Sequence, residues 1–197
     1  MLTPPESAAL VFFDIDGTLL NDRKQIPDSA VAAIKQLQRN GHLAFLNTGR
    51  AYSVIQPHIL APGFDGIVAA CGTWIQLGGE QLLNVTIEQA LVRLLIDRLS
   101  ACDIHVWFEG PSHVYVESLN SGTRLDEFLE YFVDLPDSLA DWHEKEIHAN
   151  KMSYMLEPQS RLDDCLSFLE EHFYLIRHMP HNGEIIPKGY SKATGMQ

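Results

Sequence analysis

The 197-residue chain has little positive charge. Its 14 lysines and arginines stand against 26 aspartates and glutamates, which gives a formal net charge of −12. Nucleic acids and anionic membrane surfaces both bind basic surfaces, so neither is expected as a partner. A small phosphate-bearing molecule is not excluded, because a bound metal ion can reverse the electric field within one cleft.

Cysteines and long apolar runs are also scarce. The three cysteines (Cys71, Cys102 and Cys165) are far apart and have no metal-type spacing, so free thiols in a reducing compartment are the simplest interpretation. No stretch approaches the roughly 20 apolar residues that span a bilayer. The first residues do not have the pattern of a secretion signal. We therefore expect a soluble, cytoplasmic protein.

The most informative segment is an apolar run over residues 9–13 that leads directly into Asp14 and Asp16. Such a run predicts a strand of a parallel sheet that is buried on both faces, and ligands bind beyond the carboxyl ends of such strands. Residues two apart in an extended chain lie on the same side, so both carboxylates could address one point. A carboxylate can attack a phosphoryl group, and Mg²⁺ would offset the charge repulsion.

Two alternatives for the acid pair are a structural turn and a calcium-binding loop. The calcium pattern fails, because Gly17 comes two residues too early and Gln25 stands where the loop needs a glutamate.

The first part of the chain alternates between predicted strands and helices. Strand-like runs at residues 42–46 and 66–70 follow the first strand, with a helix predicted over residues 29–40 and another from residue 47 towards residue 56. Short connections in this order predict right-handed parallel crossovers.

The pattern then changes to an antiparallel α+β unit. Hairpins are predicted over residues 73–85 and 174–186. The remaining elements are expected to be helices over residues 86–102, 122–132 and 160–173, and strands over residues 104–108, 113–117 and 147–156.

Three segments together resemble a known family. Residues 14–20 (DIDGTLL) resemble the first motif of the haloacid dehalogenase (HAD) superfamily of phosphohydrolases. Residues 47–50 (NTGR) resemble its second motif, and residues 186–192 (IPKGYSK) resemble its third motif in the Cof-type, class IIB branch. The resemblance implies an α/β fold whose Rossmann-like parallel sheet core is truncated at the C-terminus and carries an inserted α+β cap domain.

The resemblance also implies domain limits and catalytic roles. The core would comprise residues 1–82 and 183–197, and the cap residues 83–182. Asp14 would be the nucleophile that forms an aspartyl-phosphate. Asp16 would be the general acid and then the base, with its backbone carbonyl on Mg²⁺. The predicted metal ligands are therefore Asp14 and Asp16.

Thr48 and Lys192 would complete the catalytic group. Thr48 would hydrogen-bond the transferred phosphoryl group, and Lys192 would neutralise its developing charge. Taken alone, Thr48 is also suited to cap a helix, and Lys192 could be an ordinary surface lysine.

Further substrate contacts are predicted at Gly17, Thr18, Gly49, Arg50, Cys71 and Gly72. Arg50 either steadies the substrate or pairs with an acid. Cys71 stands where the branch usually has asparagine, and a buried small hydrophobic residue explains it better than a reactive thiol.

One family feature is missing from the sequence. The fourth motif, an acidic cluster that completes the Mg²⁺ shell, would follow Lys192, but the sequence ends at Gln197. We therefore expect either a piece of a longer protein or a truncated relative, with weak Mg²⁺ affinity. Missing core strands would leave a sheet edge open, which favours a homo-oligomer.

The predicted function is that of a Mg²⁺-dependent phosphatase for small phosphomonoesters, such as sugar phosphates or related metabolites. One alternative is a truncated, non-catalytic module that binds a phospho-ligand or serves regulation. Another is a phosphomutase or phosphotransferase, which would share the aspartyl-phosphate.

Overall fold

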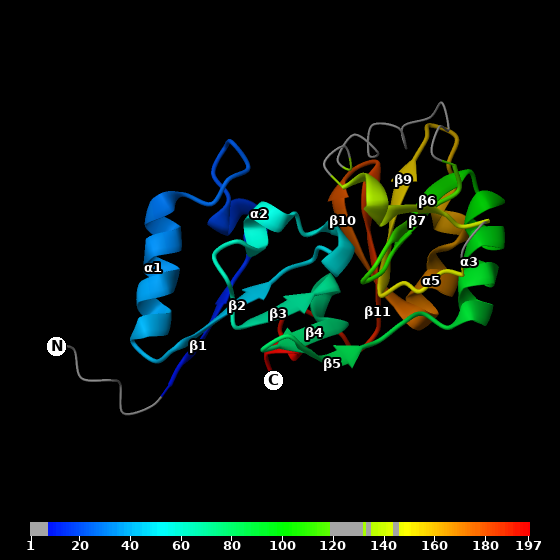
Figure 1. Ribbon diagram of the computed structural model, residues 1–197. Coiled ribbons are helices and arrows are strands. Elements are labelled where there is room, and N and C mark those ends of the chain that lie inside the picture. Colours follow the sequence, from blue (N-terminus) through cyan, green and yellow to red (C-terminus); the bar gives the residue numbers. More distant parts are fainter. Residues whose placement is uncertain (1–7, 119–131, 133–134, 144–145) are drawn as a thin grey trace.

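The computed structural model describes residues 8–118, 132, 135–143 and 146–197. Its strands form two sheets that lie side by side, with helices on the outer sides of both (Figure 1). The helix predicted over residues 122–132 falls almost entirely outside the described residues.

The first sheet contains the predicted parallel strands. Within the described ranges its spatial order is β1 (Leu10–Phe13), β2 (Leu43–Asn47), β3 (Gly66–Ala69), β4 (Trp74–Leu77) and β5 (Glu80–Asn84). β1, β2 and β3 are parallel, whereas β4 and β5 form the predicted antiparallel hairpin. The carboxyl ends of β1 and β2 therefore meet at one edge, as the sequence predicts.

The prediction that the first strand is buried on both faces is wrong. In the part of the chain that the structure describes, β1 lies at the end of the sheet and pairs with β2 alone. Leu10 is 53% exposed, and the other residues of β1 are half-buried. An apolar run shows that a strand avoids water but does not show how many neighbours cover it.

The first predicted helix is confirmed as α1 (Asp28–Arg39), which lies along the first sheet at the left of Figure 1. The continuous helix predicted towards residue 56 is wrong. The chain forms a short 3₁₀ turn, η2 (Tyr52–Val54), and then α2 (Pro57–Leu60). Proline disfavours the helical conformation of the residue before it, and Gln56 is accordingly extended (φ −63°, ψ 147°).

The second sheet is mainly antiparallel. Its spatial order within the described ranges is β10 (Phe173–Met179), β11 (Asn182–Pro187), β9 (Lys151–Leu156), β6 (Ile104–Glu109), β7 (Val114–Val116) and β8 (Leu139–Asp141). The hairpin predicted over residues 174–186 is confirmed by the pairing of β10 with β11. β7 and β8 are parallel.

Two helices cover the outer face of the second sheet (Figure 1). They are α3 (Gln89–Ser100), which packs against β6, and α5 (Leu166–His172), which packs against β10. The helix predicted over residues 160–173 is divided, because a separate 3₁₀ turn, η6 (Leu162–Asp164), precedes α5. A large apolar cluster between these helices and the sheet includes the fully buried side chains of Leu95, Leu99 and Phe108.

The two sheets are linked by hydrogen bonds as well as by the chain. Ile87 donates its backbone N–H to the Ala149 carbonyl (2.8 Å), and the Asn150 amide donates to the Val85 carbonyl (2.8 Å). The Ser53 hydroxyl donates to the Gly110 carbonyl (2.8 Å). In the described part of the chain, no helix has both the length and the apolar character needed to span a membrane. The domain limits at residues 82/83 and 182/183 stay a prediction.

Candidate active site

The first motif forms a wide turn at the carboxyl end of β1. Asp14 precedes this turn, η1 (Ile15–Leu19), and its Oδ1 accepts the Ile15 N–H (2.8 Å). Gly17 has φ +71°, which side-chain-bearing residues seldom adopt, so glycine allows the chain to reverse here. Ile15 is buried, whereas Asp16 and Thr18 are exposed. The turn thus directs the Asp16 carboxylate away from the core.

Each of the two acids is paired with a cation. Lys192 Nζ lies 2.7 Å from Asp14 Oδ2. Arg50 binds Asp16 through two parallel hydrogen bonds, from Nη2 to Oδ1 (2.7 Å) and from Nε to Oδ2 (2.9 Å). The structure thus brings Asp14, Asp16, Arg50 and Lys192 together from three separate segments.

The ion pair affects the acidity of Asp16. The hydrogen bonds from Arg50 hold the pKa of Asp16 below its usual value, although partial burial acts in the opposite direction. The Asp16 carboxylate is therefore ionised in this arrangement, and it must leave Arg50 before it can hold a proton.

Thr48 lies just beyond β2 and is fully buried. Its backbone N–H donates to the Val68 carbonyl (2.9 Å), and its hydroxyl oxygen accepts the Arg50 N–H (3.1 Å). The interpretation of Thr48 as a helix cap is wrong, because the next helical turn starts only after Ala51. The hydroxyl proton can therefore be donated to another acceptor.

The segment after β3 lies against the second motif. Cys71 is buried, and its Sγ would contact a Cβ at Gly49 at 3.4 Å. Burial raises the pKa of the Cys71 thiol to about 11, which supports its interpretation as a neutral, small hydrophobic side chain. Gly72 has φ +89°, and a Cβ there would lie 2.3 Å from the Ser191 carbonyl oxygen. This close approach brings the third motif against the core sheet.

The backbone of Lys192 is also fixed to the core. Asn47, the last residue of β2, donates its side-chain N–H to the Lys192 carbonyl (3.1 Å). Ser191 and Thr194 bind each other across a tight turn, including a bond from the Ser191 N–H to Thr194 Oγ1 (2.9 Å). Lys192 therefore reaches Asp14 from a segment that is held on both sides.

A cavity of about 520 Å³ lies over the acid pair. Six of the predicted residues line it: Asp14, Asp16, Gly49, Arg50, Cys71 and Lys192. Gly17, Thr18, Thr48 and Gly72 are not among its described lining residues.

The opposite wall of the cavity comes from the second sheet, and the sequence analysis missed it. Tyr174, Ile176 and His178 of β10, and Glu184 and Ile186 of β11, all line the cavity. The alternation of these residues along a predicted hairpin indicates a shared face, but only the fold shows what that face covers.

The donor chemistry of the site suits a hard cation, because carboxylate oxygens are ligands of Mg²⁺. The number of ligands is too small for a complete site. In the described ranges, no group of three or more histidine, cysteine, aspartate or glutamate residues is placed to hold a metal ion. Asp14 and Asp16 would supply protein oxygens, and water or other ligands would have to complete the coordination shell.

The chain is similar in sequence to known proteins. A family model for haloacid dehalogenase-like hydrolases matches residues 11–197. The putative phosphatase YkrA of Bacillus subtilis is 24% identical over 189 residues, which are 95% of this chain and 72% of that protein.

Solved structures share the fold. A hypothetical protein from Geobacillus kaustophilus superimposes with a TM-score of 0.79 at 21% identity, over 96% of this chain and 73% of that one. The subclass IIB sugar phosphatase BT4131 superimposes with a TM-score of 0.72 at 22% identity, over 96% of this chain and 74% of that one.

Proposed function

The chain belongs to the haloacid dehalogenase-like hydrolases, and on this premise we propose that it hydrolyses small phosphomonoesters. The observation that carries the proposal is the meeting of Asp14 and Lys192 at 2.7 Å within a cavity that Asp16 and Arg50 also line. A carboxylate nucleophile beside two cations is what attack on an anionic phosphoryl group requires.

The contacts of Asp14 indicate which oxygen attacks. Oδ1 is held by the Ile15 N–H, whereas Oδ2 faces Lys192. Oδ2 forms the bond to phosphorus, and the bond between phosphorus and the ester oxygen breaks. The Lys192 ammonium group can exchange its contact with Oδ2 for contacts with the phosphoryl oxygens and offset their negative charge.

Asp16 would handle the proton of the leaving group. The incoming phosphate competes for the Arg50 guanidinium, and release from Arg50 lets the pKa of Asp16 rise. Asp16 can then take up a proton from solvent water and pass it to the ester oxygen. Asp16 then takes a proton from the water that attacks phosphorus, which frees Asp14 and releases phosphate.

Mg²⁺ is part of the proposal. Asp14 and the backbone carbonyl of Asp16 would hold it, and when bound it would neutralise phosphoryl charge during attack. Sugar phosphates or related metabolites are the proposed substrates, and the sugar phosphatase BT4131 among the similar folds supports this class.

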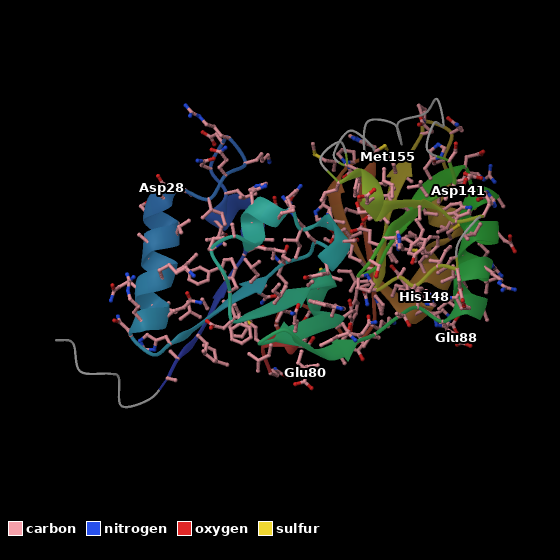
Figure 2. All side chains as sticks on the ribbon, viewed as in Figure 1. Asp28, Glu80, Glu88, Asp141, His148 and Met155 are labelled. Carbon is pink, nitrogen blue, oxygen red and sulfur yellow. The ribbon has the colours of Figure 1, made fainter. Side chains whose placement is uncertain are left out.

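Replacing Asp14 with asparagine tests the nucleophile. In Mg²⁺-containing buffer, the D14N chain should release phosphate from p-nitrophenyl phosphate at least about a thousandfold more slowly than the parent. A matched control is D28N, because Asp28 is an exposed acid at the start of α1 (Figure 2). Equal rates in the parent and D14N would show that Asp14 is not the nucleophile.

A binding module is the second candidate, and one observation favours it. Both acids are already paired with cations, and no third acidic or histidine ligand joins them among the residues described. Calorimetry with a non-hydrolysable phosphate ester separates the candidates. A Kd for the ester that does not change with Mg²⁺, together with no turnover of p-nitrophenyl phosphate, would support the binding module.

A further inference from the structure

Lys151, the first residue of β9, is a buried lysine with no role in the mechanism above. Its side chain is 1% exposed, yet it carries a charge among three oxygen acceptors. Its Nζ lies 2.6 Å from Glu184 Oε1, 3.1 Å from the Gly49 carbonyl oxygen and 3.6 Å from Glu109 Oε2. Burial alone lowers the pKa of Lys151, but the two carboxylates more than compensate, so its pKa is raised above the usual value.

The three acceptors come from different parts of the fold. Glu109 and Glu184 belong to β6 and β11, the neighbours of β9 in the second sheet. These two carboxylates offset the charge of the buried ammonium group and exceed it by one negative charge. The third acceptor, the Gly49 carbonyl oxygen, belongs to the second motif, which follows β2 of the first sheet. Lys151 therefore also connects the two sheets at the active site.

The Gly49–Arg50 peptide is held at both of its polar atoms. Lys151 binds its carbonyl oxygen, and its N–H donates to Thr48 Oγ1 at 3.1 Å. Because this N–H occupies an acceptor position of the Thr48 hydroxyl, it fixes the direction in which the hydroxyl proton can be donated. The same peptide group leads into Arg50, whose side chain donates hydrogen bonds to the Asp16 carboxylate.

We propose that Lys151 is a positioning residue that locks the Gly49–Arg50 peptide and thereby holds the Arg50 side chain, which lines the cavity, in position for a bound phosphoryl group. The inference rests on the proposed function, because it assigns Arg50 a phosphoryl ligand. It adds to the predicted site residues a residue from the second sheet. Lys151 itself does not touch the phosphoryl group.

The test uses a variant in which loss of the lysine leaves no buried carboxylate without a partner. Glu109 is 7% exposed in its side chain, whereas Glu184 is 21% exposed and lies 3.6 Å from His178 Nε2. The K151M/E109Q variant therefore removes the ammonium together with the more deeply buried acid. E109Q alone is the matched control, because Lys151 keeps Glu184 and Gly49.

Two measurements follow on the 197-residue chain: amide hydrogen exchange of Arg50 by NMR, and the Kd of inorganic phosphate. K151M/E109Q should exchange the Arg50 amide about tenfold faster than E109Q and bind phosphate about tenfold more weakly, as expected for loss of one charged hydrogen bond. The amides of β2 should keep their exchange rates. S53A removes another hydrogen bond between the sheets and should change neither quantity.

The outcomes separate this inference from the proposed function. An Arg50 amide that exchanges equally in K151M/E109Q and E109Q would overturn the positioning role, as would a uniform acceleration of all amides. If the parent chain neither binds phosphate nor hydrolyses a phosphate ester, the proposed function fails, regardless of the exchange rate of the Arg50 amide.

Discussion

Gly72 offers a direct test of how the third motif is held. A Cβ at Gly72 would lie 2.3 Å from the Ser191 carbonyl oxygen and 3.3 Å from the Gly195 nitrogen, and the backbone has φ +89°. Gly189 has the same φ of +89°, but nothing lies within 4 Å of its Cβ position. G72A and G189A therefore share the backbone strain, about 1–2 kcal/mol, and differ in the steric clash.

The clash in G72A should cost a further 1–3 kcal/mol, roughly the range for an inserted methyl group in a packed site. Urea denaturation followed by circular dichroism should accordingly show G72A to be less stable than G189A by about that amount. Because Ser191 precedes Lys192, G72A should also weaken binding of inorganic phosphate. Equal unfolding free energies for the two variants would refute the close packing of residues 72 and 191.

Two further predictions concern buried groups. With a pKa of about 11, Cys71 has a thiolate fraction on the order of 10⁻³ at pH 8. Iodoacetamide should therefore label Cys71 far more slowly in the folded chain than in the urea-unfolded chain. The rate of labelling in the folded chain should increase as the pH rises towards 11. Rapid labelling of the folded chain at pH 8, measured by peptide mass mapping, would contradict this. Ser153 Oγ donates to the buried Glu109 carboxylate, so S153A should destabilise the chain by about 1.5–3 kcal/mol. S138A, which removes a bond to the neutral Leu135 carbonyl, should cost only about 1 kcal/mol, and an equal loss in both would contradict the charge-assisted bond.

Local patterns were enough to predict most of the strands. The parallel strands β1 to β3 follow short apolar runs, and the hairpin of β4 and β5 turns at Gly78 and Gly79. The hairpin of β10 and β11 turns at Pro180 and His181, whereas the expected turn residue Gly183 lies within β11. These features depend on residues that are close in sequence.

The errors have physical causes outside such patterns. The helix predicted towards residue 56 is reduced to a 3₁₀ turn because Ala51 and Ile55 are extended on either side of it, and Pro57 keeps Gln56 extended as well. The burial of β1 was overestimated because burial depends on which elements come to lie against a strand, and among the described residues β1 pairs with β2 alone. Neither the number of neighbours nor the break at Cys165 before α5 follows from apolar periodicity alone.

The candidate site shows the same division between local and distant information. Asp14 and Asp16 could be found from one short motif, but the state of these acids depends on Lys192 and Arg50, which the fold brings from elsewhere. Lys151 could not be found at all, because a lysine at the start of a strand usually faces solvent.

The balance of charge in the site is consistent with the proposed binding of a phosphate ester by an acidic chain. The pairs Asp14–Lys192 and Asp16–Arg50 are each neutral overall, so the cavity floor does not carry the net charge of −12. An incoming phosphate can exchange places with the carboxylates on the two cations, because it offers them the same kind of oxygen acceptor. Each exchange frees a carboxylate where the proposed chemistry needs it. In the proposed mechanism, ion pairing before binding therefore keeps the two carboxylates from reacting until an anion replaces them on Lys192 and Arg50.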